Sequence, residues 1–226
     1  MHNLRKNKSV TNSLIARTVL GACLFSALVS GCATPSSIYP SYKPAGVYLQ
    51  IPRQWHEIST TELAQQEKKS TAAGAADRAA RVQWQIAYSS SPNITAADVF
   101  SLKSVSDPII FIRIRSLSDY ESNAVSLNSL RDVIVPITEW IAGISTISRF
   151  DLAVDEPFND KGGSGIHSRY TFGAESQEAQ TLDQRVVLTP DRKTLIVVVA
   201  RCSEICFKQN REALDTITSS FRVVGK

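Results

Sequence analysis

The sequence has few of the residues and motifs that carry chemistry. Its 226 residues include three His, four Cys and one Met, and no Cys or His cluster has the spacing of a zinc site. The Gly-x-Ser-x-Gly elbow of hydrolases, the P-loop, the Rossmann glycine pattern and the EF-hand spacing are missing as well. The segment 162–166, Gly-Gly-Ser-Gly-Ile, comes nearest to the elbow and fails at its last position, so we interpret it as a loop that needs positive φ. We expect no metal, no cofactor and no enzymatic activity.

Long apolar runs are also absent. The longest, residues 19–30, is well short of the roughly 20 apolar residues that span a membrane. Residues 1–31 contain four basic residues and no acidic one, and the run leads into Val29-Ser30-Gly31-Cys32. This arrangement is typical of a secretory signal, and its last four residues resemble a bacterial lipobox, in which the Cys is acylated and becomes the first mature residue. We predict a signal peptide over 1–31, lipid attachment at Cys32, and a lipid-anchored location on the extracytoplasmic face of the cell membrane.

An excess of charge of one sign is missing from the mature chain. The full sequence has 25 basic and 21 acidic residues, and removal of the four basic residues of the signal leaves the two signs equal. The isoelectric point of the full sequence, about 8.9, is therefore high because of the basic residues in the export signal. We expect no nucleic-acid partner, because such partners select a basic face.

Only two cysteines remain after processing, because Cys23 leaves with the signal and Cys32 carries lipid. Outside the cytoplasm, Cys202 and Cys206 are expected to form a disulfide. In a strand, positions four apart lie roughly 13 Å from each other, whereas bridged Cα atoms need about 4.4–6.8 Å. The strand that begins at 194 must therefore end by about Cys202, and 202–206 forms the corner into the last helix. A redox-active pair is the weaker alternative, since the spacing is not Cys-x-x-Cys.

The rest of the chain predicts an extended tether followed by one domain. Residues 32–45 contain three Pro and three Ser and no apolar periodicity, so we expect a tether there and a single domain over 46–224. Apolar alternation and β-branched runs predict strands over 81–89, 109–115, 150–154, 165–173, 181–189 and 195–200.

Helices are predicted between these strands. Capping boxes at Ser59 and Ser118 precede expected helices over 63–69 and from Ser118 to Pro136, and 207–221 carries an amphipathic stripe. A short helix is expected over 95–103, while 137–144 fits a helix or a strand. Short connections in the second half indicate antiparallel pairing. The predicted class is α+β, an antiparallel β-sheet sandwiched between helices.

Four stretches carry a resemblance to a known fold: 46–55 (GVYLQIPRQW), 162–170 (GGSGIHSRY), 199–207 (VARCSEICF) and 217–223 (ITSSFRV). Together they resemble the PsbP-like fold, an α/β/α sandwich shared by an extrinsic photosystem protein, a Ran-binding protein and many bacterial lipoproteins, and most of all its actinobacterial lipoproteins. The resemblance implies a binding or accessory module without chemistry of its own.

The polar side chains leave two hypotheses open. The first is a non-enzymatic lipoprotein that binds an envelope protein or an apolar ligand, and it predicts a concave apolar surface near the weak helices. The alternative is an envelope hydrolase that uses His167 with a nearby Ser and Asp155. His56 and the acidic residues around Asp155 are otherwise interpreted as surface groups, and a calcium site at Asp151, Asp155, Glu156 and Asp160 is the less favoured interpretation. Trp55, Trp84 and Trp140 are expected to be core anchors, with a ligand groove lined by one of them as the alternative.

Overall fold

A computed structural model describes residues 35–144, 147–175 and 177–224. The chain divides into two units, Met1–Pro35 and Ser36–Lys226, and the description below concerns the second. The predicted signal peptide and Cys32 lie outside the described residues. No helix in the described part of the chain is long and apolar enough to cross a membrane.

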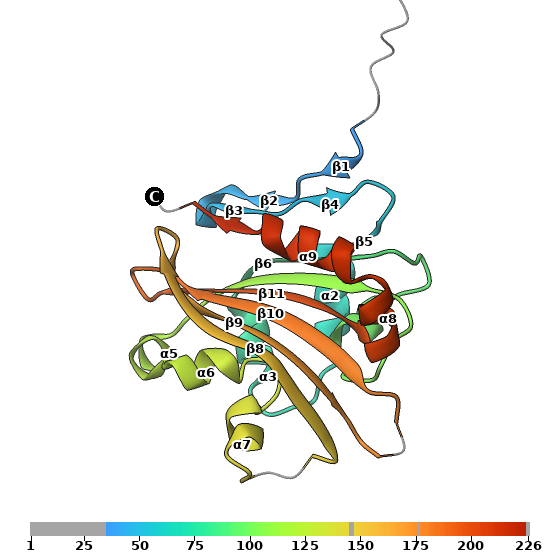
Figure 1. The fold of residues 1–226 in the computed structure, drawn as a ribbon. Helices are drawn as coiled ribbons and strands as arrows, with labels where there is room; N and C mark the ends of the chain where they lie inside the picture. Colours follow the sequence, from blue (N-terminus) through green and yellow to red (C-terminus); the bar gives the residue numbers. More distant parts are fainter. Residues whose placement is uncertain (1–34, 145–146, 176, 225–226) are drawn as a thin grey trace, which may run out of the picture. The chain divides into compact units, whose positions relative to one another are not determined.

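In these residues, a seven-stranded antiparallel sheet forms the centre of the unit, in the order β5-β6-β7-β11-β10-β9-β8 (Figure 1). Its strands are β5 His56–Ile58, β6 Val82–Ser89, β7 Ile109–Ser116, β8 Arg149–Asp160, β9 Gly163–Gly173, β10 Gln180–Leu188 and β11 Thr194–Ser203. The inner strands β10 and β11 are buried over nearly their whole length, which explains why 195–200 is apolar without alternation.

Short connections join the last four strands. Asp160 ends β8, and Gly163, with a φ of +138°, opens β9, where a Cβ would come 2.1 Å from the carbonyl oxygen of Leu188. The expected positive φ is thus confirmed at Gly163, but 163–166 lies within β9 and not in a loop. Arg192 has a φ of 58° in the turn between β10 and β11. These turns make the pairing antiparallel throughout this half.

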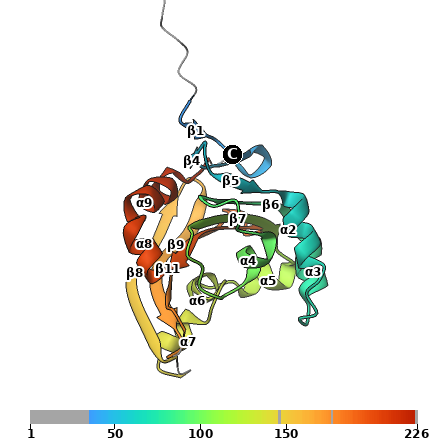
Figure 2. The same cartoon turned by 90° about the vertical axis from the view of Figure 1, so that its right-hand side faces the viewer.

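Helices lie on both sides of the sheet (Figure 2). On one side are α8 Glu204–Gln209 and α9 Arg211–Ser220. On the other are α2 Thr60–Glu67, α3 Ala75–Ala80, α4 Ala96–Phe100, α5 Asp119–Ala124, α6 Leu127–Arg131 and α7 Ile137–Ile141. The predicted α+β class, with an antiparallel sheet between helix layers, is confirmed.

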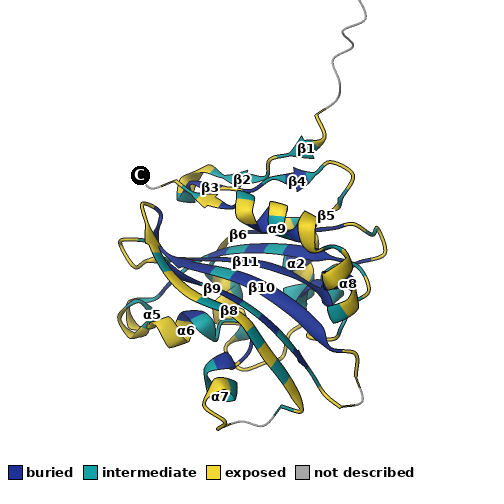
Figure 3. Cartoon of the chain, viewed as in Figure 1, coloured by how far each residue is buried: buried dark blue, intermediate teal, exposed yellow. Residues whose placement is uncertain are grey.

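The side covered by α8 and α9, called here the α9 face, holds the largest apolar core (Figure 3). Ile196, Val198 and Ala200 of β11 project to this face, where Leu214 and Ile217 of α9 are 1% and 2% exposed. The predicted helix over 207–221 is interrupted at Asn210, which ends α8 and precedes α9. Its apolar stripe is nevertheless buried, because both pieces lie on the same core.

The predicted long helix up to Pro136 is wrong. The structure has two short helices, α5 and α6, separated where Val125 takes an extended conformation and Ser126 caps α6 through the amide of Ser129. Tyr120 and Leu127, two of the apolar residues at helical spacing in this segment, are 83% and 47% exposed. The ambiguous segment after Pro136 is helical, as α7.

The predicted tether also needs correction, because its described part is folded. Two short strands, β1 Ser37–Ile38 and β2 Ser41–Tyr42, pair with β4 Ile51–Pro52 and β3 Val47–Tyr48, and the 3-10 turn η1 Lys43–Ala45 follows β2. The ring of Tyr42 stacks on that of Trp84 at 5.8 Å. The strand β12 Arg222–Val223 pairs with the other side of β3, so β2, β3 and β12 form a three-stranded sheet.

Candidate functional site

A groove lies on the side of the sheet opposite the α9 face, called here the groove face. It has a volume of about 860 Å³ and runs over β7, β10 and β11, between α2–α4 and α5–α6. This volume is within the ~300–1,000 Å³ typical of small-molecule sites. The groove matches the concave surface that the sequence analysis expects near the weak helices.

The floor of the groove is an apolar stripe on β11. Leu195, Val197 and Val199 occupy every second position and therefore project to one face, with exposures of 3%, 4% and 3%. Arg201 continues the stripe at the next such position. Apolar side chains from the surrounding elements complete the lining: Val99, Phe100, Leu102, Phe111, Ala124, Val125, Leu130, Val133, Ile134 and Leu182.

Two arginines of β7 hold the walls of the groove. Arg113 pairs with Glu67 of α2 at 2.5 Å, and Arg115 pairs with Glu121 of α5 at 2.7 Å. Burial raises the pKa of Glu121, but hydrogen bonds from Ser118 and the charge of Arg115 outweigh that effect and lower it to about 2. Arg113 and Arg115 are two positions apart on β7 and therefore project to the same face of the sheet, from which each reaches a helix on a different wall.

Arg201 differs from these two because it has no carboxylate within ion-pair distance in the part of the chain that the structure describes. The residue is 4% exposed, and its Nη1 donates to the carbonyl of Lys103 at 3.2 Å and to Oε1 of Gln180 at 3.0 Å. Its Nη2 donates to the carbonyl of Asp98. Burial lowers the pKa of Arg201 to about 10, which leaves it charged at neutral pH.

His167, the candidate catalytic residue of the hydrolase hypothesis, does not line the groove. It belongs to an ionic cluster on the α9 face. His167 Nε2 is 2.7 Å from Asp183 Oδ1, and Arg169 Nε donates to Asp183 Oδ2 at 2.9 Å. Arg169 also pairs with Asp215 of α9. Burial raises the pKa of Asp183, whose side chain is 1% exposed, but the hydrogen bond and charge of His167 and Arg169 outweigh it, so the net pKa is lowered. This cluster fastens α9 to the sheet.

Asp155 lies on the opposite side of the sheet from His167. It accepts hydrogen bonds from Arg131 of α6 at 2.8 and 3.0 Å and from Ser168 at 3.1 Å. Asp155 pairs in register with Ser168, whereas His167 pairs with Glu156, and successive strand positions point to opposite faces. The alternative set of His167, Asp155 and a Ser is therefore not assembled, and Asp155 instead anchors α6 to β8.

The other candidates are dispersed. No group of three or more metal-ligating side chains occurs within the described residues, and the acidic residues from Asp151 to Asp160 lie along β8 on alternating sides. His56 is exposed on the edge strand β5. The three Trp side chains contact core clusters and none lines the groove, as in the favoured interpretation.

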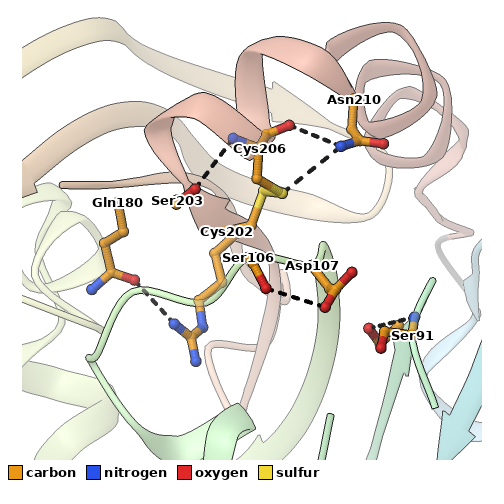
Figure 4. Close-up of a disulfide and its surroundings, with 10 residues drawn as sticks. Ser91, Ser106, Asp107, Gln180, Cys202, Ser203, Cys206 and Asn210 are labelled. Carbon is orange, nitrogen blue, oxygen red and sulfur yellow. Dashed lines mark hydrogen bonds between the residues drawn. A yellow bond between two sulfur atoms is a disulfide. The ribbon is translucent and has the colours of Figure 1, made fainter. Parts of the chain in front are cut away.

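Cys202 and Cys206 are joined by a disulfide with Cα atoms 5.9 Å apart (Figure 4). β11 continues one residue beyond the predicted end, to Ser203, whose side chain caps α8 through the amide of Cys206. Asn210 donates to the carbonyl of Cys206 at 2.9 Å. The disulfide thus lies on the α9 face at the strand-to-helix corner, one residue beyond Arg201.

Arg201 was not among the site residues expected from the sequence. A signal was available, because Arg201 directly follows the apolar run 195–200 and keeps the period of Val197 and Val199. A charged side chain at a buried strand position needs partners or a ligand. Helices were expected in the segments that form the walls, although as one long helix where α5 and α6 lie. The distance between these helices across β11 depends on tertiary contacts.

No family model matches the chain, and no curated protein matches it. Among solved structures, cyanobacterial PsbP (CyanoP) from Synechocystis sp. PCC 6803 is 13% identical with a TM-score of 0.48, over 86% of this chain and 96% of that one. LpqN, involved in cell envelope biogenesis of Mycobacterium tuberculosis, is 12% identical with a TM-score of 0.44, over 83% and 90%. The Saccharomyces cerevisiae Ran-binding protein Mog1p is 10% identical with a TM-score of 0.44, over 85% and 97%.

These similarities concern the fold alone, and all three TM-scores are below 0.5. The identities are too low to transfer a partner or an activity, since one fold serves many functions. The actinobacterial-type lipoprotein assignment stays a prediction.

Proposed function

We propose that this protein is a membrane-anchored extracytoplasmic lipoprotein that acts as a non-enzymatic binding module and holds an apolar ligand in the groove. The groove itself is the observation that supports ligand binding. Its floor is continuous aliphatic surface, and its walls come from two separate groups of helices. A small ligand is favoured over an envelope protein, because the concavity is bounded on both sides.

Two further observations support a binding role. Leu102 and Tyr120 line opposite walls and are 51% and 83% exposed, so apolar surface is left uncovered around the groove. The chain also has the Val29-Ser30-Gly31-Cys32 signal, which favours a lipid anchor at Cys32. Anchoring at a membrane would keep the groove close to a source of apolar molecules.

The proposal is tested by mass spectrometry of the lipidated protein, isolated from membranes in mild detergent. We expect an N-terminal peptide that begins at acylated Cys32 and a retained apolar compound. Leu102→Glu, on the groove, is expected to reduce the retained compound at least fivefold. The matched control is Ile205→Glu, at an apolar residue of α8 that is 61% exposed on the α9 face, and it should retain the wild-type amount.

Two results would contradict the proposal. Recovery of the bare protein, or equal retention by both variants, would remove the groove as the ligand site. A mature chain that still contains residues 1–31 and carries no acyl group at Cys32 would overturn the anchored location.

A further inference from the structure

The charges around the groove do not balance. Its lining includes four arginines and two glutamates: Arg78, Arg113, Arg115, Arg201, Glu67 and Glu121. Arg113 and Arg115 are neutralised by Glu67 and Glu121. Two cations remain without a carboxylate partner in the described structure, one of them on the exposed helix α3 and the other, Arg201, on the floor.

Arg201 is the buried cation of the two. Its Nη atoms donate to neutral oxygens of Asp98, Lys103 and Gln180, while its Nε donates to no acceptor within the described residues. Three fully buried side-chain atoms of the described residues have no partner: Ser104 Oγ, Thr138 Oγ1 and Arg185 Nε. Arg201 Nε is not one of these, so this unpaired donor keeps some exposed surface. A buried guanidinium without a counter-ion is costly, and an anion that reaches it gains a charge-assisted hydrogen bond.

Arg201 lies at one end of the apolar floor, so the two ends of the groove differ. Leu195, Val197 and Val199 precede it along β11, and six residues of strand span about 20 Å. This length is comparable with the extended tail of a long-chain fatty acid. The β7 neighbours at the far end of the stripe are Arg115 and Arg113, opposite Leu195 and Val197, and both are already paired. One end of the stripe therefore has a buried cation that interacts with the charge of Asp98 but has no described carboxylate within ion-pair distance. At the other end both arginines are paired.

We propose that the ligand of the groove is an amphiphile with a single anionic head group, of the long-chain fatty acid type. Its head group lies on Arg201, and its tail follows Val199, Val197 and Leu195 towards α5 and α6. This inference rests on the proposed function, because it names the ligand class of the same groove.

The first test compares two ligands with the same tail and different head groups. The unacylated mature chain, residues 32–226 with Cys32→Ser, is titrated at pH 8 with oleate and with oleyl alcohol in displacement of a fluorescent fatty acid. We expect oleate to bind at least tenfold more tightly. Arg201→Gln should abolish this difference and leave the affinity for oleyl alcohol unchanged, and Arg201→Lys should restore part of it. Arg78→Gln, the matched removal of an exposed groove cation, should keep the wild-type preference.

The possible outcomes distinguish the anionic ligand class from the more general function of binding an apolar ligand. Equal affinities of the wild type for oleate and oleyl alcohol would overturn the anionic ligand class and leave the apolar binding function standing. Binding of neither compound would count against both. Loss of the preference in Arg78→Gln, with retention in Arg201→Gln, would move the head group to α3 and overturn the role of Arg201.

A second measurement uses the wild-type sequence at position 201, in case Arg201→Gln does not fold. Stearates with a spin label at carbon 5 or at carbon 16 are added to the same unacylated chain, labelled with ¹⁵N. The carbon-5 label should broaden the amide signals of 98–103, beside Arg201, and the carbon-16 label those of 118–125, on α5. The opposite order would overturn the proposed orientation.

Discussion

The α9 face and the groove face cover the same sheet in different ways. On the α9 face, the ten residues of α9 and the six of α8 fill the surface above β11 and bury Leu214, Ile217 and Phe207. On the groove face, six helices of five to eight residues are spread over the sheet and leave the groove between them. Helices this short are not stable alone, so each depends on its attachments.

Those attachments explain why a groove persists instead of collapsing. Ser59 and Ser118 cap α2 and α5 through capping boxes, and Arg113 and Arg115 of β7 hold these two helices by ion pairs. Asp155 holds α6 through Arg131. The groove-face helices thus combine a few buried apolar side chains with polar contacts to the sheet. On the α9 face, the ionic cluster of Asp183 is joined by apolar packing that fills the space above β11.

The largest effect is expected from Asp183→Asn, which removes the buried carboxylate that links His167 and Arg169 beneath α9. Breaking a buried ion pair costs about 3–5 kcal/mol, so unfolding in urea at pH 7 should show a loss of about 4 kcal/mol. The folded pKa of Asp183 is lowered, so its contribution is present above the unfolded value near 3.9 and is lost as pH falls through the folded value. The difference between wild type and variant should shrink below about pH 4.

The matched control for this prediction is Asp151→Asn, at an exposed position of β8. It should change the free energy of unfolding by less than about 0.5 kcal/mol. If Asp183→Asn were equally mild at pH 7, the ionic cluster would not be what fastens α9 to the sheet.

A smaller effect is expected from truncating one Leu on each face. Leu214→Ala removes a side chain that is 1% exposed under α9 and should destabilise the protein by about 3 kcal/mol. Leu102→Ala removes one that is 51% exposed on the groove and should cost less than about 1 kcal/mol. Urea unfolding of both variants measures the difference, and similar losses would contradict the view that Leu102 borders an open groove, whereas Leu214 lies in a close-packed core.

The smallest effect is expected from the ion pairs of the groove walls. A double-mutant cycle with Arg113→Gln and Glu67→Gln should give a coupling energy below about 1 kcal/mol, because both side chains keep some contact with water. The same cycle at Arg115 and Glu121, which are 20% and 30% exposed, should give a smaller value. A coupling of several kcal/mol in either cycle would mean that the groove wall is held as firmly as α9.

The core of the sheet could be predicted because its signals are local. Alternation at 81–89 and 109–115 and the apolar run at 195–200 correspond to β6, β7 and β11. In β7, the separation of Phe111, Arg113 and Arg115 from the Ile residues at 110, 112 and 114 follows from the two-residue period of a strand. The disulfide geometry could be deduced for a similar reason, since a spacing of four residues excludes a strand between the two cysteines.

Predictions that needed distant contacts were wrong or incomplete. Residues 36–45 have the composition of a tether, but pairing with β3 and β4 and the stacking of Tyr42 on Trp84 hold them on the domain. The helix expected up to Pro136 breaks at Val125, where the carbonyl of Val125 accepts a hydrogen bond from Arg192 of the hairpin turn. Neither partner is visible from the local sequence.

The chain's residues alone determine the α+β class, the pairing of Cys202 with Cys206 and the two-sided pattern of each strand, because each of these depends on neighbours within a few positions. For the same reason they predict the export signal with Cys32. Only the tertiary structure decides that His167 and Asp155 lie on opposite faces, that Arg201 is buried beside an apolar stripe, and that the short helices leave a groove above it. Strand register and the gaps between helices depend on contacts up to a hundred residues apart, and no local pattern specifies them.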